Sequence, residues 1–175
     1  YEIDTRDWSS DVCSSDLKNE VLSIHYRECK VEELPPHLCE LVQKAKEACE
    51  TSYAPYSKFH VGAALLLDNG ETVTGSNQEN ASFPAGTCAE RCAVFYAHAR
   101  WPEAAATHIA IAAIDSTGQF TENPITPCGI CRQVLSETQK RGGRNLHVLL
   151  YGRNGVRIIE NIDDLLPFSF DLDAE

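Results

Sequence analysis

The sequence predicts one α/β domain, a three-layer α/β/α sandwich built on a mixed sheet of about five strands. Helical and strand-like segments alternate along most of the chain, which is typical of a sheet covered by helices. Two strongly apolar runs, 109–114 and 147–151, flank a helical segment, and such a unit forms a parallel strand pair. A length of 175 residues is enough to form one core without disulfides.

Residues 35–100 are expected to form two helices and a hairpin. After two prolines at 35 and 36, apolar residues recur at helical spacing, which predicts a surface helix. The apolar run 59–68 ends in an Asp-Asn-Gly turn, and residues 72–74 supply the returning strand. A second helix is predicted over about 88–100, because a Trp-Pro pair ends it.

The second half of the chain is expected to form the parallel unit and another hairpin. A helix over about 128–140 connects the two strongly apolar runs. An Asn-Gly pair then predicts a tight turn into a last strand, 156–159. Asp163 is expected to cap a short final helix that ends before Pro167.

Residues 1–20 are expected to lie outside the domain, which we assign to 21–175. Residues 6–17 have neither a helical nor a strand period and resemble a translated sequencing adapter, so they are left out of the fold prediction. A native disordered extension is the alternative. Under either interpretation Trp8 and Cys13 take no part in the chemistry.

Composition restricts the classes of function. A formal net charge of -11 and a pI near 4.9 repel phosphate backbones, which disfavours a nucleic-acid partner. No apolar run approaches the roughly 20 residues that span a bilayer, and no signal-peptide pattern occurs. We therefore expect a cytoplasmic protein with no membrane partner. Eight cysteines in a chain with long apolar strands and helices indicate reduced thiols.

Three cysteines have the spacing of metal ligands. Cys128 and Cys131 lie three residues apart, on one face of the first turn of a predicted helix, which suits tetrahedral zinc. Cys88 supplies a third thiol at the start of another predicted helix. Glu90 follows two residues later and points elsewhere, because positions i and i+2 do not share a helix face. Glu90 is therefore not expected to be a ligand.

Three protein ligands leave one position of a tetrahedral zinc free, which is typical of a catalytic site. Cys92 offers an alternative, because it lies one turn after Cys88 and could complete a closed, structural four-cysteine site. That alternative would make the protein a non-catalytic zinc-binding module. The two hypotheses differ in whether Cys92 reaches the metal.

Five segments of the chain form a recognisable series: YAPYSKFHVGAA, NQENAS, CAER, PCGICRQVL and LLPFSF. A ligand-x-Glu segment followed by Pro-Cys-x-x-Cys is typical of zinc deaminases. From about Leu34 to Phe170 the chain resembles the homotetrameric zinc-dependent cytidine deaminase family, in which these segments occur in the same order. The resemblance implies a cytidine deaminase-like fold, a homotetramer and one Zn²⁺ per subunit. It also implies hydrolysis of cytidine and 2′-deoxycytidine to the uracil nucleosides and ammonia, a reaction of pyrimidine salvage.

The resemblance assigns roles around the metal. Glu90 is the catalytic residue: it takes a proton from the water that zinc activates, delivers it to N3 of the pyrimidine and later protonates the departing amine. Arg91 would hydrogen-bond the ligand sulfurs and offset their negative charge, with a solvated helix charge as the alternative. Gln133 could orient the metal loop or simply cover the helix surface.

The resemblance also assigns residues that bind the substrate. Asn77 and Glu79 alternate along an extended segment and are expected to hydrogen-bond the ribose, although they could instead be polar turn residues. Phe59 would line the base pocket or belong to the core. Ala89 is assigned to substrate binding as well. Phe170 would reach into the active site of the neighbouring subunit, or fold back on its own core.

Phe83 departs from the family pattern, because many relatives carry tyrosine there and place its hydroxyl near the sugar. A related zinc deaminase acting on another cytosine-containing compound, or on bases in nucleic acid, would share the metal and the glutamate. Asn77 and Glu79 favour a free nucleoside. A cysteine at position 88, where nucleic-acid deaminases commonly have histidine, and the negative charge argue against a nucleic-acid substrate.

Overall fold

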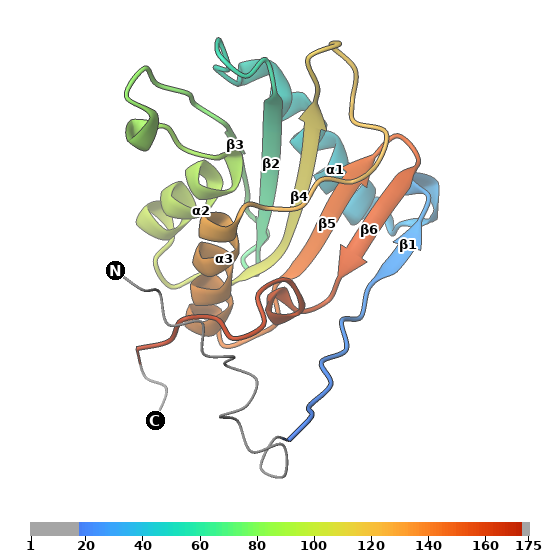
Figure 1. The fold of residues 1–175 in the computed structure, drawn as a ribbon, viewed down its shortest axis with the longest axis vertical. Coiled ribbons are helices and arrows are strands. Elements are labelled where there is room, and N and C mark those ends of the chain that lie inside the picture. Colours follow the sequence, from blue (N-terminus) through green and yellow to red (C-terminus); the bar gives the residue numbers. More distant parts are fainter. Residues whose placement is uncertain (1–17, 173–175) are drawn as a thin grey trace, which may run out of the picture.

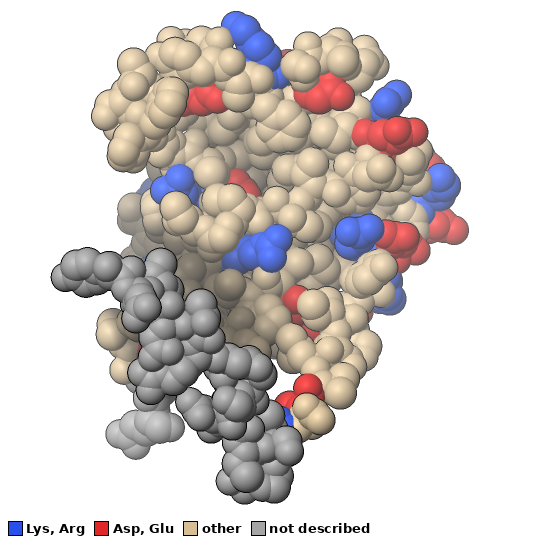
Figure 2. Space-filling view, viewed as in Figure 1, with Lys and Arg blue, Asp and Glu red and all other residues tan. Residues whose placement is uncertain are grey.

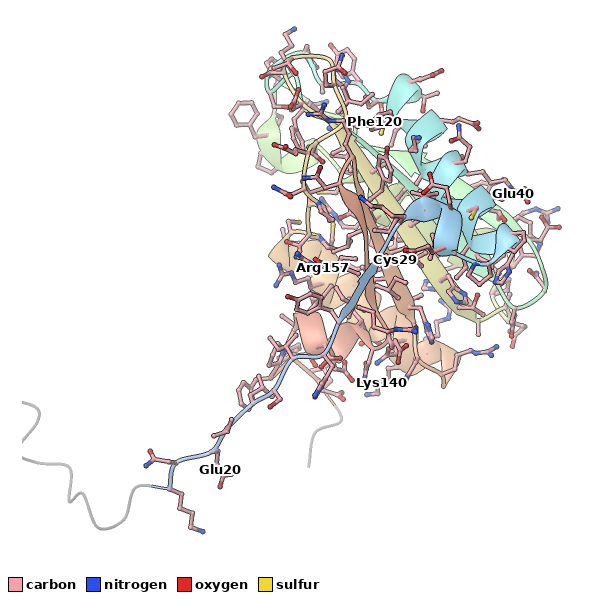
Figure 3. All side chains as sticks on the ribbon, turned by 90° about the vertical axis from the view of Figure 1, so that its right-hand side faces the viewer. Glu20, Cys29, Glu40, Phe120, Lys140 and Arg157 are labelled. Carbon is pink, nitrogen blue, oxygen red and sulfur yellow. The ribbon has the colours of Figure 1, made fainter. Side chains whose placement is uncertain are left out.

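The computed structural model describes residues 18–172. The adapter-like stretch 6–17, with Trp8 and Cys13, lies outside the described residues. Residues 18–26 run away from the edge of the sheet as an extended segment (Figure 3). None of the described helices is long and apolar enough to span a membrane.

The described residues form one six-stranded mixed sheet with the order β1-β6-β5-β4-β2-β3 (Figure 1). The strands are β1 (Arg27–Cys29), β2 (His60–Leu67), β3 (Thr72–Ser76), β4 (Ala106–Ile114), β5 (His147–Gly152) and β6 (Gly155–Ile159). Only β4 and β5 pair in parallel, and the other neighbours are antiparallel. Both predicted hairpins and the parallel unit are therefore confirmed.

Helices cover both faces of this sheet, as predicted. Helix α1 (Pro36–Ala48) packs on one face, and α2 (Ala89–Arg100) and α3 (Gly129–Gly142) pack side by side on the other (Figure 1). The central strands direct large side chains such as Ile109 and Ile111 toward α2 and α3. They direct small ones such as Ala110 and Ala112 toward α1. The three-layer α/β/α class is therefore confirmed.

The sheet has one strand more than the sequence predicts. Strand β1 has only three residues and pairs with β6, so that Glu28 lies opposite Arg157. Ion pairs hold this edge: Arg157 contacts Glu28, and Arg27 contacts Glu160. Basic and acidic side chains lie next to one another along the β1–β6 side of the face in Figure 2.

The last helix also differs from its prediction. It is a single 3₁₀ turn, η5 (Ile162–Leu165), and its N-cap is Asn161. The Asn161 side chain accepts a hydrogen bond from the Asp163 backbone N–H, at 3.0 Å. The prediction of an Asp163 cap was therefore wrong by two residues, because the first turn starts earlier and asparagine is an equally good cap.

Three histidines gather where α1 begins, on the face of the sheet that α1 covers. His108 and His147 lie opposite each other on β4 and β5, with ring centroids 4.8 Å apart. His37 lies edge-on to His108, at 6.3 Å. Burial lowers the pKa of His108 to about 4, and the charges of His147, His37 and Arg144 act in the same direction.

This cluster predicts a loss of stability in mild acid. The pKa of His108 in the folded state lies below its unfolded value of about 6.5, so the folded state resists protonation and stability falls as the pH drops from about 6.5 towards 4. Between pH 7 and pH 5, His108→Gln should lose less free energy of unfolding than the wild type, by on the order of 1 kcal/mol after allowance for partial exposure. Urea unfolding at both pH values measures this, and His25→Gln on the exposed N-terminal segment is the control. Equal losses in wild type and His108→Gln would contradict the prediction.

Candidate metal centre and active site

The predicted metal ligands meet where the N-termini of α2 and α3 come together. Cys88 is the N-cap of α2 and Cys128 the N-cap of α3, while Cys131 lies in the first turn of α3. Free backbone N–H groups and the positive ends of both helix dipoles favour thiolates at these positions. The local sequence therefore places all three sulfurs in positive potential.

The three sulfurs have the spacing of a tetrahedral metal site. They all lie within 4.8 Å of one another, and the Sγ atoms of Cys88 and Cys128 are 3.8 Å apart. Sulfurs about 2.3 Å from a tetrahedral zinc lie about 3.8 Å from each other. Within residues 18–172 this is the one such group of three or more potential ligands. The donor set fits Zn²⁺.

Cys92 does not belong to this group. Its Cβ lies beside β3, because a Cβ built on Gly75 would be 2.9 Å from it. Burial raises the pKa of the Cys92 thiol, so this sulfur is held as a thiol. The alternative of a closed four-cysteine site does not fit this geometry.

The thiols influence one another strongly. Hydrogen bonds from Cys131 and from Arg91 lower the pKa of Cys88 to about 5. The same contact with Cys88, together with burial, raises the pKa of Cys131. One thiolate therefore forms readily in this cluster, and a bound cation is needed to stabilise further ones.

Arg91 points into the sulfur cluster. Its Nη2 donates a hydrogen bond to the Cys88 sulfur at 3.6 Å, and this contact raises the pKa of the guanidinium. The Nε atom is buried and has no hydrogen-bond partner within the described part of the chain. A freely solvated charge, the alternative for Arg91, does not match this half-buried position.

Glu90 is buried beside the cluster without belonging to the ligand group. Only 4% of the residue is exposed, and burial raises the pKa of its carboxyl group, with the Cys88 charge acting in the same direction. The neighbouring Cys131 side chain acts in the opposite direction and lowers the pKa of this carboxyl. Burial therefore makes this carboxylate a stronger proton acceptor than an exposed glutamate.

Helix α2, which begins at the sulfur group, packs closely against β3. A Cβ on Gly75 would come within 2.5 Å of the Ala89 carbonyl oxygen and 2.6 Å of the Ala93 nitrogen. Only glycine allows this approach. Ala89 lies between Cys88 and Glu90 and is completely buried.

Asn77 and Glu79 follow β3 and hold the loop that precedes β2. The Asn77 amide accepts from the Val61 N–H at 2.7 Å and donates to the Phe59 carbonyl at 2.9 Å. One Glu79 oxygen accepts from the backbone N–H groups of Tyr56 and Ser57. The Ser57 side chain and these N–H groups lower the pKa of Glu79. Asn77 therefore positions half-buried Phe59, while Glu79 holds the turn at Tyr56 and Ser57. Each side chain keeps hydrogen-bonding capacity for a ligand.

Known proteins resemble this chain in sequence and in fold. A family model described as the cytidine and deoxycytidylate deaminase zinc-binding region matches residues 36–142. The chain belongs to this family. It is a zinc-dependent deaminase, and its three-sulfur group fits the zinc binding that the family description names.

Relatives of this deaminase carry consistent names. The chain is 44% identical to a cytidine deaminase of Halalkalibacterium halodurans over 55% of its own length and 68% of that protein. It is 40% identical to a cytidine deaminase of Mycobacterium tuberculosis over 74% of its length and 86% of that protein. A crystal structure of cytidine deaminase from Burkholderia pseudomallei superposes with a TM-score of 0.66 at 39% identity, covering 78% of this chain and all of that one.

Gln133 of the deaminase has a role that its position in the sequence does not indicate. Its Nε2 donates to the Phe170 carbonyl at 2.9 Å, and the Phe170 N–H donates to its Oε1 at 3.1 Å. Gln133 thus holds the C-terminal segment instead of orienting the metal loop or merely covering α3. The Phe170 residue remains 69% exposed, so it does not fold back on its own core.

Arg132 is a residue of the deaminase that the sequence analysis missed. It follows Cys131 directly and donates hydrogen bonds to the Thr126 hydroxyl and to the carbonyls of Pro127 and Leu165. Its position four residues after Cys128, at the end of the first turn of the ligand helix, is the signal that could have found it.

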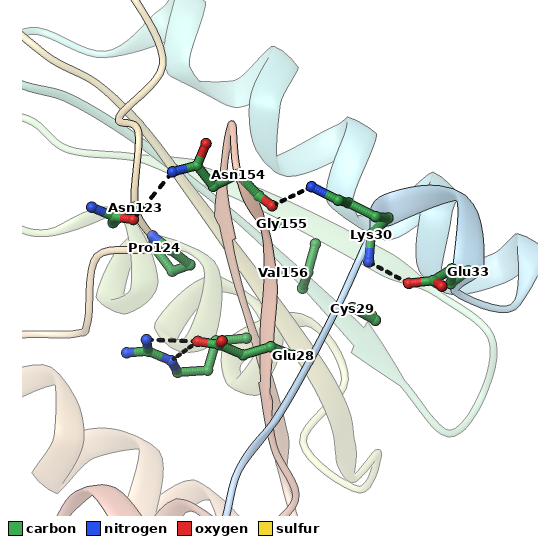
Figure 4. Close-up of a pocket in the computed structure, with 10 residues that line it drawn as sticks. Glu28, Cys29, Lys30, Glu33, Asn123, Pro124, Asn154, Gly155 and Val156 are labelled. Carbon is green, nitrogen blue, oxygen red and sulfur yellow. Dashed lines mark hydrogen bonds and ion pairs between the residues drawn. The ribbon is translucent and has the colours of Figure 1, made fainter.

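A cavity at the sheet edge lies apart from the predicted site residues of the deaminase. It has a volume of about 420 Å³ and lies between the β1–β6 edge and residues 123–124 (Figure 4). Its polar groups pair with one another: Arg157 contacts Glu28, and Lys30 Nζ donates to the Asn154 carbonyl at 2.8 Å. None of the predicted site residues lines it.

Proposed function

We propose that this deaminase hydrolyses cytidine and 2′-deoxycytidine to uridine and 2′-deoxyuridine, with release of ammonia. The observation that carries the proposal is that Glu90, a buried acid, lies beside a group of three cysteine sulfurs that does not include Cys92. The names of the relatives support the substrate class.

Cys88, Cys128 and Cys131 would hold one zinc ion. Zinc in such a site supplies a Lewis acid that makes water a better nucleophile near neutral pH. Glu90 takes a proton from the attacking water, delivers it to N3 of the pyrimidine and later protonates the amine that leaves C4. Cytidine and water thus give uridine and ammonia, and the protein keeps no atom of either.

The remaining residues bind the substrate and tune the charge. Asn77 and Glu79 use their free hydrogen-bonding capacity on the ribose, and Phe59, positioned by Asn77, lines the base pocket. Arg91 offsets the negative charge of the thiolates through its contact with Cys88.

The active site is completed in a homotetramer. Phe170 has its backbone fixed by Gln133 while its ring is exposed, so it is available to close the pocket of a neighbouring subunit. Phe168 is 98% exposed and has a φ of 59°, which is strained for this residue type. Light scattering should give four times the 19.3 kDa chain mass.

Ultraviolet monitoring of cytidine, deoxycytidine, cytosine and CMP, each with and without a chelator, tests the proposed reaction. We expect turnover of the two nucleosides only, loss of turnover after chelation and recovery when zinc is added back. Turnover of CMP or free cytosine alone would reject the substrate assignment. Turnover that survives complete removal of the metal would reject the mechanism.

The charge on Arg91 makes a separate prediction. Arg91→Ala should lower kcat about 10- to 100-fold while most of the zinc remains bound, because the side chain contacts a ligand sulfur without being a ligand. Arg100→Ala removes the same charge from the exposed end of α2 and should have little effect. Zinc per chain is measured together with kcat. Complete loss of metal from Arg91→Ala would show that Arg91 is required for the site to form.

A further inference from the structure

Arg132 connects the segment that precedes Cys128 to the C-terminal part of the fold. Its Nε donates to the Pro127 carbonyl at 2.8 Å, Nη2 to the Thr126 hydroxyl at 3.1 Å and Nη1 to the Leu165 carbonyl at 2.8 Å. Two of these three acceptors lie in the segment directly before Cys128, and the third closes η5. The guanidinium is half-buried between them.

The segment that Arg132 holds has little other support. Residues 124–127 are irregular and make no backbone–backbone hydrogen bond to any of the described residues. Two of them, Pro124 and Pro127, have no N–H to donate. Burial of Pro127 and packing of Ile125 against the core keep the segment close to the protein body, but these contacts have no directional specificity.

Among the three proposed ligands, Cys128 is the one whose sulfur position depends most on residues 124–127. Cys131 is buried and Cys88 half-buried, whereas Cys128 is exposed. Packing therefore fixes the first two sulfurs, and the backbone that precedes Cys128 must fix the third.

We propose that Arg132 is a positioning residue for the zinc site, which places the Cys128 sulfur by anchoring Thr126 and Pro127 to the Leu165 carbonyl. Arginine suits this task because its planar fork donates to several acceptors at once, which a lysine ammonium at the end of a flexible chain does not reproduce. The inference rests on the proposed three-sulfur site, and it assigns no contact between Arg132 and substrate.

The test compares metal binding in Arg132→Gln, Arg132→Lys and the control Arg141→Gln. Arg141 lies on the same helix and also donates to a backbone carbonyl, that of Pro102 at 2.7 Å, but away from the sulfur group. Zinc affinity is measured by chelator competition without substrate. Cobalt-substituted protein gives the sulfur-to-metal charge-transfer absorption, whose intensity follows the number of bound thiolates.

We expect Arg132→Gln to lower zinc affinity about 10- to 100-fold. Its charge-transfer intensity per cobalt should fall by about one third, because one of three thiolates is lost. Arg132→Lys should fall between Arg132→Gln and wild type, and Arg141→Gln should match wild type. Thr126→Val removes one of the three hydrogen bonds and should lower zinc affinity by a smaller factor. This variant replaces Arg132→Gln in the test if Arg132→Gln does not fold.

Wild-type affinity and an unchanged cobalt spectrum in Arg132→Gln would overturn the inference. An equal loss of affinity in Arg141→Gln would also overturn it, because the effect would then be one of general stability. If wild-type protein itself showed fewer than three bound thiolates, the proposed zinc site would fail instead, so the two failures are distinguishable.

Discussion

Replacing Glu90 by glutamine is expected to lower the turnover of cytidine by at least about 10³-fold, with zinc and fold retained. Glutamine has the shape of glutamate but no exchangeable carboxyl proton, so it can neither accept a proton from water nor deliver one to the pyrimidine. Burial disfavours the charged form of Glu90, which is why the pKa of its carboxyl is raised. The amide of glutamine is neutral, so the substitution does not destabilise the fold by burying a charge.

Steady-state turnover, zinc per chain and thermal unfolding measure these effects together. Glu137→Gln, at an exposed position on α3, is the matched control and should behave as wild type. Wild-type turnover in Glu90→Gln would remove this residue from the mechanism. A loss of zinc in parallel with activity would instead make Glu90 part of the metal site.

Cys88→Ala and Cys92→Ala should differ sharply, although the two cysteines lie one helical turn apart. Cys88→Ala removes one of the three sulfurs that lie within 4.8 Å of one another, so zinc should be lost and turnover should fall by at least about 10³-fold. Cys92→Ala leaves those sulfurs in place and should keep one zinc per chain. Its expected cost is on the order of 1 kcal/mol of unfolding free energy, from lost packing beside Gly75.

Zinc content and turnover, measured on both variants purified side by side, decide whether Cys88 alone or both cysteines bind the metal. Equal zinc loss from both would support a four-cysteine structural site and exclude the catalytic arrangement. Full zinc retention in Cys88→Ala would mean that the ligand is another residue.

Each part of the sulfur group was predictable from sequence because its signature is local, and the family resemblance brought the two parts together. Cys128 and Cys131 share a helix face through their spacing, and Cys88 precedes a helix that Trp101-Pro102 ends. The same holds for the parallel β4–β5 pair, whose apolar runs and intervening helix specify one connection.

Other features depend on pairings between distant residues and leave no local pattern. Strand β1 is the sequence Arg-Glu-Cys, without alternation of apolar and polar residues, and it forms only because β6 offers an edge and Arg157 an ion-pair partner. Gln133 meets the Phe170 backbone 37 residues away. A glutamine on a helix surface gives no sign of such a partner.

The arrangement of the sulfurs has a consequence for how the molecule assembles. Cys88 lies at the middle of the chain, at the start of α2, and its neighbour Cys128 lies 40 residues later, at the start of α3, which packs beside α2. An ion shared by these thiolates acts as a removable cross-link that closes a long loop. Because such an ion would bind the folded chain more tightly than the unfolded one, its binding would raise the free energy of unfolding. Metal supply would then control both how long the protein survives and whether it is active.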